Sequence, residues 1–206
     1  MLEVKALAAA RGGRCVFKSL ALSAGAGELI EISGANGSGK STLLRVLAGL
    51  LAPAEGSIEW RGASLDEAID DYRGASAFLG HLNGLKDELT VEENLCFDAA
   101  ARGRPAGDEE LRRALRALGL EALRTRPCRR LSQGQRRRVA LARLPLAAAS
   151  LWLLDEPIAA LDDPSVERFA QLLTAHLAAG GAALVATHQP LRVTPARRVH
   201  LAAVDS

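Results

Sequence analysis

The chain has 206 residues, of which 49% are hydrophobic and 3% aromatic, and its formal net charge is +2. This length and hydrophobic content predict one domain, residues 1–206, with a sizeable core. So small a net charge and so few aromatic side chains argue against nucleic acid as a partner. No run of about 18 apolar residues occurs, so we expect no segment of this chain to span a membrane.

Short apolar segments between turn residues predict the strands. Residues 2–9 and 15–22, separated by the turn sequence RGGR, predict a hairpin. Further strands are predicted at residues 28–33, 57–60, 75–80, 151–154 and 182–187. The last two segments are continuous apolar runs, which is typical of parallel strands that are buried on both faces.

Helices are predicted at residues 40–50, 90–102, 109–118, 132–144 and 163–180. Pro145 is expected to end or bend the fourth of them. Strands that alternate with helices predict an α/β fold with a mostly parallel sheet core, preceded here by N-terminal antiparallel strands. Residues 82–144 interrupt the alternation and predict an inserted helical subdomain, whose arginines are expected on a solvated face. The α/β core would then consist of residues 1–81 and 145–206.

Residues 34–42, GANGSGKST, fit the phosphate-binding loop pattern G-x-x-x-x-G-K-[ST] between a predicted strand and a predicted helix. Glycines let such a loop turn its N–H groups toward phosphate oxygens, and the following helix N-terminus favours an anion. Lys40 is expected to reach the β- and γ-phosphates, and the Ser41 hydroxyl to ligate Mg²⁺. The residues expected to bind the nucleotide are Gly34, Ala35, Asn36, Gly37, Ser38, Gly39, Lys40, Ser41 and Thr42.

Polar residues also follow other predicted parallel strands, where ligands bind in such sheets. Asp155 ends a buried apolar run, so we expect it to be the second protein ligand of Mg²⁺. Glu156 beside it is expected to act as the general base for an attacking water. His81 and His188 follow two further strands. His188 would contact the γ-phosphate or hold that water, although a single histidine is more often structural than catalytic.

The segment LSQGQ at residues 131–135 narrows the class of protein. Together with GANGSGKST, LWLLDEP, ALD and ATH, it resembles the nucleotide-binding domain of ATP-binding cassette (ABC) transporters over about residues 3–201. The resemblance implies the P-loop NTPase fold of that family, ATP and Mg²⁺ as cofactors, and ATP hydrolysis with Lys40, Glu156 and His188 as catalytic residues. The signature residues are Leu131, Ser132, Gln133, Gly134 and Gln135.

The resemblance further implies that two copies of the chain pair head to tail around two ATP molecules. Each ATP would lie between Lys40 of one copy and the signature residues of the other, with Leu161 and Asp162 as the D-loop. A helix N-terminus offers N–H groups to an anion, so ATP can hold the dimer closed. Hydrolysis removes the shared γ-phosphate, so the closed dimer weakens and can drive a partner.

Three positions depart from the common pattern of the family. Gln133 replaces a glycine of the signature. His81 stands where a glutamine is usual, and a ring nitrogen could still ligate Mg²⁺ or a bound water. Arg11 stands where an aromatic residue usually stacks on adenine. Its planar guanidinium could stack on the base in the same way, or Arg11 could be a solvated turn residue.

Longer segments, including FLGHLNGLKDELTVEENL and SQGQRRRVALARL, resemble the ATP-binding subunits that serve cytochrome c biogenesis. This implies a peripheral subunit on the cytoplasmic face of the bacterial inner membrane, bound to a CcmB-like transmembrane permease and other haem-delivery membrane proteins. ATP hydrolysis would drive haem export or release of a haem-loaded chaperone. The alternatives are the ATPase of another ABC exporter, of lipids or drugs, and a soluble ABC protein that takes no part in transport.

Overall fold

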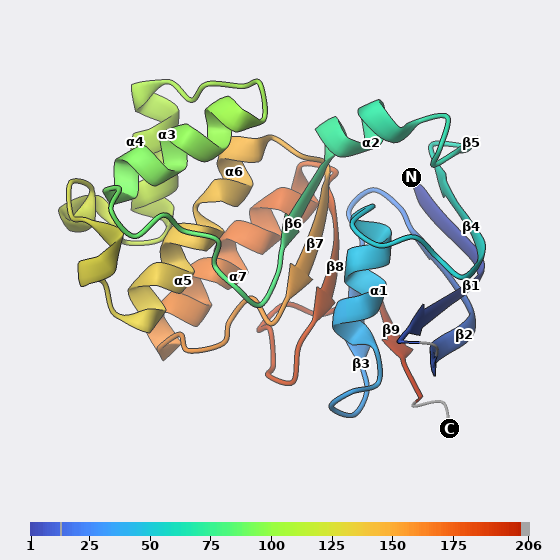
Figure 1. Cartoon of the computed structure of the whole chain (residues 1–206). Helices are drawn as coiled ribbons and strands as arrows, with labels where there is room; N and C mark the ends of the chain where they lie inside the picture. Colours follow the sequence, from blue (N-terminus) through green and yellow to red (C-terminus); the bar gives the residue numbers. More distant parts are fainter. Residues whose placement is uncertain (13, 203–206) are drawn as a thin grey trace.

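The structure, a computed structural model, describes residues 1–12 and 14–202. Within these residues the strands form two sheets (Figure 1). The N-terminal sheet is antiparallel, with the strand order β2-β1-β4-β5. Its strands are β1 (Leu2–Arg11), β2 (Arg14–Ala24), β4 (Glu55–Trp60) and β5 (Ala63–Ser64).

The second sheet is parallel, with the strand order β6-β7-β8-β3-β9. Its strands are β3 (Leu29–Ser33), β6 (Ser76–Leu79), β7 (Leu151–Asp155), β8 (Ala182–Ala186) and β9 (Arg197–His200). The predicted N-terminal hairpin and the predicted strands are confirmed, apart from small shifts of their ends. The sequence pattern does not predict β9, because this edge strand is mostly exposed and polar.

The helices divide between the two sides of the parallel sheet. Those of the described residues are α1 (Lys40–Leu47), α2 (Ile69–Ala75), α3 (Val91–Ala101), α4 (Asp108–Ala117), α5 (Gln133–Leu141), α6 (Arg143–Ala147) and α7 (Asp163–Ala178), with short 3₁₀ turns η1 (Glu121–Leu123) and η2 (Cys128–Arg130). In Figure 1, α1 lies toward the N-terminal sheet, whereas α3 to α6 gather at the opposite end of the molecule. None of the helices described here has the length and apolar character needed to cross a bilayer.

The central strand β7 is buried on both faces, and its side chains alternate between two hydrophobic clusters. Trp152 and Leu154 belong to the cluster that contains residues of α7 and of α3 to α6. Leu151 and Leu153 belong to the cluster that contains α1 and the N-terminal sheet. This alternation follows from the two-residue period of a strand. The carboxyl end of β7 is therefore held rigidly between two cores.

The predicted helix at residues 132–144 is wrong in one respect, because the chain forms two helices there. The first, α5, ends at Leu141, and α6 begins at Arg143. Pro145 lies in the first turn of α6, where it does not end a helix, because the N–H groups of a first turn have no intrahelical partner. The helix breaks ahead of the proline, because Pro145 has no N–H to donate to the carbonyl oxygen of Leu141, four residues earlier, and its ring crowds that carbonyl. The division into a core and an inserted subdomain at residues 82 and 144 stays a prediction.

Candidate active site

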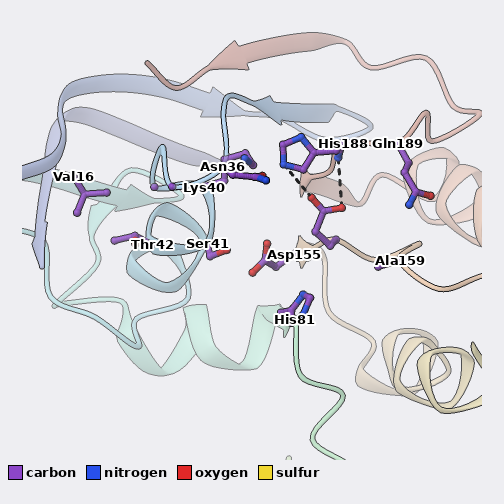
Figure 2. A pocket seen from close by; sticks show the side chains of 13 residues that line it. Val16, Asn36, Lys40, Ser41, Thr42, His81, Asp155, Ala159, His188 and Gln189 are labelled. Atoms are coloured by element: carbon purple, nitrogen blue, oxygen red, sulfur yellow. Dashed lines mark hydrogen bonds and ion pairs between the residues drawn. The ribbon is translucent and has the colours of Figure 1, made fainter. Parts of the chain in front are cut away.

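A cleft of about 560 Å³ opens at the carboxyl end of the parallel sheet. The structure brings to this cleft ten of the residues expected in the site (Figure 2). These are Asn36, Gly37, Gly39, Lys40, Ser41, Thr42, His81, Asp155, Glu156 and His188. Val16, Ala159 and Gln189 also line the cleft, and none of the motifs predicts a role for them. Ala159 and Gln189 each lie next to a motif and Val16 lies on β2, but only the folded chain shows that these residues face the cleft.

The loop between β3 and α1 depends on two glycines in left-handed backbone conformations. Gly34 has φ 146°, and a Cβ atom there would lie 2.5 Å from the carbonyl oxygen of Leu201. Gly39 has φ 98°, and a Cβ atom there would lie 2.5 Å from Cγ1 of Val16. A residue with a side chain therefore cannot replace either glycine unless the neighbouring segment of the same chain moves. Strand β2 and the C-terminal segment thus fix the shape of the loop.

Helix α1 starts at Lys40, and no side chain caps its N-terminus. The N–H groups of its first turn consequently point toward the cleft without intrahelical partners, which is the arrangement that favours an anion. The Lys40 side chain is 8% exposed, and its ammonium donates to the carbonyl oxygens of Gly34 at 2.8 Å and Ala35 at 3.0 Å. An ammonium has three N–H donors, so one remains for a phosphate oxygen.

Figure 2 shows Asp155 between Ser41 and His81 in the cleft. Asp155 is 3% exposed and is held at the end of β7, whereas Ser41 lies in the first turn of α1. A hydroxyl and a carboxylate are oxygen donors of the kind that Mg²⁺ prefers. Among the described residues there is no group of three or more His, Cys, Asp or Glu side chains that could hold a metal alone. Mg²⁺ usually binds through one or two carboxylates together with substrate phosphates and water.

Glu156 and His188 follow the neighbouring strands β7 and β8, and they contact each other. The backbone N–H of His188 donates to Oε2 of Glu156 at 3.4 Å, and the ring atom Nε2 of His188 lies 3.7 Å from Oε1 of Glu156 (Figure 2). Glu156 has φ 48°, which is uncommon for a residue with a side chain. Its N–H donates to the carbonyl oxygen of Ala186 at 2.8 Å. Such a conformation persists only where the surroundings hold it, and it directs the carboxylate into the cleft.

The signature residues lie away from the cleft of their own chain. Ser132 caps α5 by accepting a hydrogen bond from the Gln135 N–H at 3.2 Å, while the Gln135 side chain accepts one from the Ser132 N–H at 3.0 Å. Ser132 and Gln133 are exposed, and Leu131 is buried. The N-terminus of α5 therefore faces solvent in this chain.

The D-loop packs against the signature. A Cβ atom at Gly134 would lie 2.7 Å from the carbonyl oxygen of Ala160, which precedes Leu161 and Asp162. Asp162 is the N-cap of α7, and hydrogen bonds from Ser165 lower the pKa of its carboxyl group. A side chain at position 134 would push these two segments apart.

The expected adenine contact is outside the part of the chain described here. Arg11 is the last residue of β1, and its side chain is not among the described atoms. Its role as a stacking residue stays a prediction. Arg11 pairs with Arg14 of the neighbouring strand β2, and Val16 of the same strand lines the cleft.

The expectation that the arginines of residues 82–144 form a solvated face is wrong for Arg137. Its side chain points inward from α5 and is 3% exposed. Because Arg136, Arg137 and Arg138 are identical neighbours in the sequence, only the direction of the helix face separates the buried one from the others. Which of the three arginines is buried depends on how α5 packs, and the sequence around them does not predict it.

We expect His81→Gln to keep the rate of ATP hydrolysis within about threefold of the unchanged protein. The amide oxygen of glutamine can replace the ring nitrogen of His81 as the expected ligand of Mg²⁺ or of a bound water. His81→Ala, which removes the ligand, should lower the rate much further. Steady-state phosphate release measures both. An inactive His81→Gln variant would show that the cleft depends on imidazole itself.

Comparison with known proteins agrees with the geometry of this cleft. The ABC transporter family matches residues 17–159. Among curated relatives, the cytochrome c biogenesis ATP-binding export protein CcmA 2 of Cupriavidus metallidurans is 46% identical, over 93% of this chain and 90% of the relative. CcmA of Nitrosococcus oceani is 44% identical, over 98% of this chain and 92% of the relative.

Solved structures show the same fold. The dimeric ATP-binding cassette MJ0796 bound to ADP and Pi superposes with a TM-score of 0.82 at 28% identity, over 100% of this chain and 97% of that one. A second dimeric structure of MJ0796, described as a bacterial ABC transporter cassette, has a TM-score of 0.84, also at 28% identity, over 98% of this chain and 94% of that one. The fold and the cleft define an ATP-binding domain with the P-loop NTPase architecture of ABC ATPases. The chain belongs to the ABC transporter family, and within it to the cytochrome c biogenesis ATP-binding export proteins CcmA.

Proposed function

We propose that this chain is the ATP-hydrolysing subunit of a membrane complex for cytochrome c biogenesis, where hydrolysis drives haem export or release of a haem-loaded chaperone. The observation that carries the proposal is the identity of 43–48% to relatives named as CcmA export proteins, over more than nine-tenths of the chain. The cleft supports the ATPase step, because it combines a phosphate loop with a carboxylate pair at the strand ends.

The chemistry follows from the residues of the cleft. Lys40 and the N–H groups of the loop would bind the β- and γ-phosphates, while Ser41 and Asp155, with His81 beside them, would hold Mg²⁺. Bound Mg²⁺ would neutralise charge on the phosphates. Glu156 would accept a proton from the water that attacks the γ-phosphorus, and ADP and inorganic phosphate would leave. His188 contacts the Glu156 carboxylate and would help to place that water.

We further propose that two copies enclose two ATP molecules. Dimeric structures of MJ0796, which has the same fold, support this arrangement. In this chain the exposed N-terminus of α5, with Ser132 as its N-cap and Gly134 in its first turn, offers N–H groups to a γ-phosphate on the other copy. Because Gly134 packs on Ala160, a movement of the α5 N-terminus would be transmitted to the D-loop residues Leu161 and Asp162.

The proposed partners are a CcmB-like transmembrane permease and other haem-delivery proteins, at the cytoplasmic face of the inner membrane. The names of the relatives, which describe an export protein, support a membrane partner. We also propose that residues 82–144 form a unit inserted into the core of residues 1–81 and 145–206. In Figure 1, α3 to α5 lie together at the end of the molecule opposite to the N-terminal sheet, which supports this division.

A pull-down in mild detergent from native membranes, with mass spectrometry of the bound proteins, tests the proposed function. We expect a transmembrane subunit together with haem-handling proteins. Recovery of an unrelated permease would keep the ATPase assignment and replace haem with another cargo, such as a lipid or a drug. Recovery of ribosomal or DNA-bound proteins, with no membrane protein, would contradict the transport role.

A further inference from the structure

The Arg137 side chain stands apart from the other arginines, because four backbone oxygens and one side-chain oxygen around the cleft use all its N–H donors. Its Nε donates to the carbonyl oxygen of Pro157 at 3.0 Å, and Nη2 donates to those of Asp155 and Glu156, both at 2.8 Å. Nη1 donates to the carbonyl oxygen of Gly80 and to Oδ1 of Asn83, both at 3.0 Å. A guanidinium has five N–H donors, and each has an acceptor here.

These acceptors belong to two segments that carry residues of the cleft. Residues 155–157 follow β7 and carry Asp155 and Glu156, while residues 80–83 follow β6 and carry His81. Because β6 and β7 are adjacent in the sheet, the two segments leave it side by side. One planar group therefore joins the main chain of Asp155 and Glu156 to Gly80 and Asn83, the residues that flank His81 in the loop.

The backbone conformation of Glu156 explains why the hydrogen bonds from Arg137 matter. Its φ of 48° costs free energy that the surroundings must supply. The hydrogen bonds of Arg137 to the carbonyl oxygens of Glu156 and Pro157 hold this turn from one side. The bond from the Glu156 N–H to Ala186 holds it from the other side.

The charge of Arg137 persists in this buried position. Burial lowers the pKa of Arg137 to about 10, although Asp155 and Glu156 nearby raise it. The guanidinium thus stays positive at neutral pH, and its hydrogen bonds to Asp155 and Glu156 go to their main-chain oxygens. A second arginine supports the same loop, since Arg143 donates to the carbonyl oxygens of Asn83 at 2.9 Å and Gly84 at 2.8 Å.

We infer that Arg137 is a positioning residue for ATP hydrolysis, which fixes the backbone of Glu156 and of the His81 loop in the geometry that the reaction needs. This inference rests on the proposed ATPase function. Arg137 belongs to α5, which begins with the signature residues. A shift of α5 when a second copy binds ATP would therefore reach Glu156 directly through this side chain.

The test compares Arg137→Gln, Arg137→Lys and the control Arg104→Gln in the full chain. Arg104 also donates to a backbone carbonyl, that of Leu146 at 3.0 Å, but neither residue lines the cleft. We expect Arg137→Gln to lower kcat by about 10- to 100-fold while KM for ATP and the affinity for a fluorescent ATP analogue change less than about twofold. Arg137→Lys should regain part of kcat, because an ammonium keeps the charge but offers only three donors. Arg104→Gln should hydrolyse ATP normally.

Three results would overturn the inference. They are a kcat of Arg137→Gln close to that of the unchanged protein, a loss of nucleotide affinity in proportion to the loss of turnover, and an equal loss of turnover in Arg104→Gln. If Arg137→Gln does not fold, folded Arg137→Lys decides the matter, since unchanged turnover in that variant overturns the positioning role. Failure of the unchanged protein to hydrolyse ATP would instead overturn the proposed function, and this inference with it.

Discussion

Replacing Lys40 with alanine is expected to lower ATP hydrolysis at least about 100-fold and to weaken ATP binding strongly. The ammonium of Lys40 lies under the phosphate loop, where it is 8% exposed and bound to the carbonyl oxygens of Gly34 and Ala35. Its charge is therefore fixed in place before a phosphate arrives, so little reorganisation is needed on binding. Titration with a fluorescent ATP analogue and steady-state phosphate release measure the two effects.

The matched control for this variant is Lys18→Ala, because Lys18 is exposed on β2 and lines no part of the cleft. It should bind and hydrolyse ATP as the unchanged protein does. Lys40→Ala also removes two hydrogen bonds to the loop, so thermal unfolding of both variants must accompany the kinetics. Normal hydrolysis by folded Lys40→Ala would contradict the assignment of residues 34–42 as a phosphate-binding loop.

The parts of the fold that the sequence predicts are those whose signals are local. The strand ahead of Gly34 and the helix after Gly39 are each marked by a pattern within ten residues, and both form as β3 and α1. The apolar run of β7 is recognisable because a strand buried on both faces needs no polar alternation. The convergence of His81, Asp155 and His188 on one cleft also follows, because parallel strands end at one edge of a sheet.

The features of the fold and site that the sequence does not predict depend mainly on tertiary packing. Strand β9 is a polar edge strand that forms because it pairs with the edge of β3. Its own sequence resembles that of a loop. The break between α5 and α6 precedes Pro145 by several residues. The burial of Arg137 is invisible among three consecutive arginines. For β9 and Arg137 the deciding partner lies far away in the sequence, whereas the break between α5 and α6 is a local effect of Pro145 on the preceding turn.

Replacing Glu156 with glutamine is expected to leave ATP binding intact, to slow hydrolysis by about 100- to 1,000-fold, and to trap a dimer in the presence of ATP and Mg²⁺. Glutamine has the shape of glutamate, and its amide oxygen can still accept the hydrogen bond from the His188 N–H. The amide cannot take a proton from water, however, and the lost negative charge reduces repulsion of the phosphates. Binding is therefore kept while the step that removes the γ-phosphate is blocked.

Light scattering during size-exclusion chromatography, with and without ATP, measures this trapping, and Glu109→Gln on the exposed start of α4 is the control. The exposed N-terminus of α5 predicts that closure also needs the signature, so adding Ser132→Arg to Glu156→Gln should restore the monomer without changing the cleft of the same chain. A monomer in Glu156→Gln at saturating ATP would contradict the two-copy arrangement while leaving the phosphate loop untouched. A dimer that survives Ser132→Arg would place the contact between copies elsewhere, because a bulky cation at that helix N-terminus removes both the cap and the room for a phosphate.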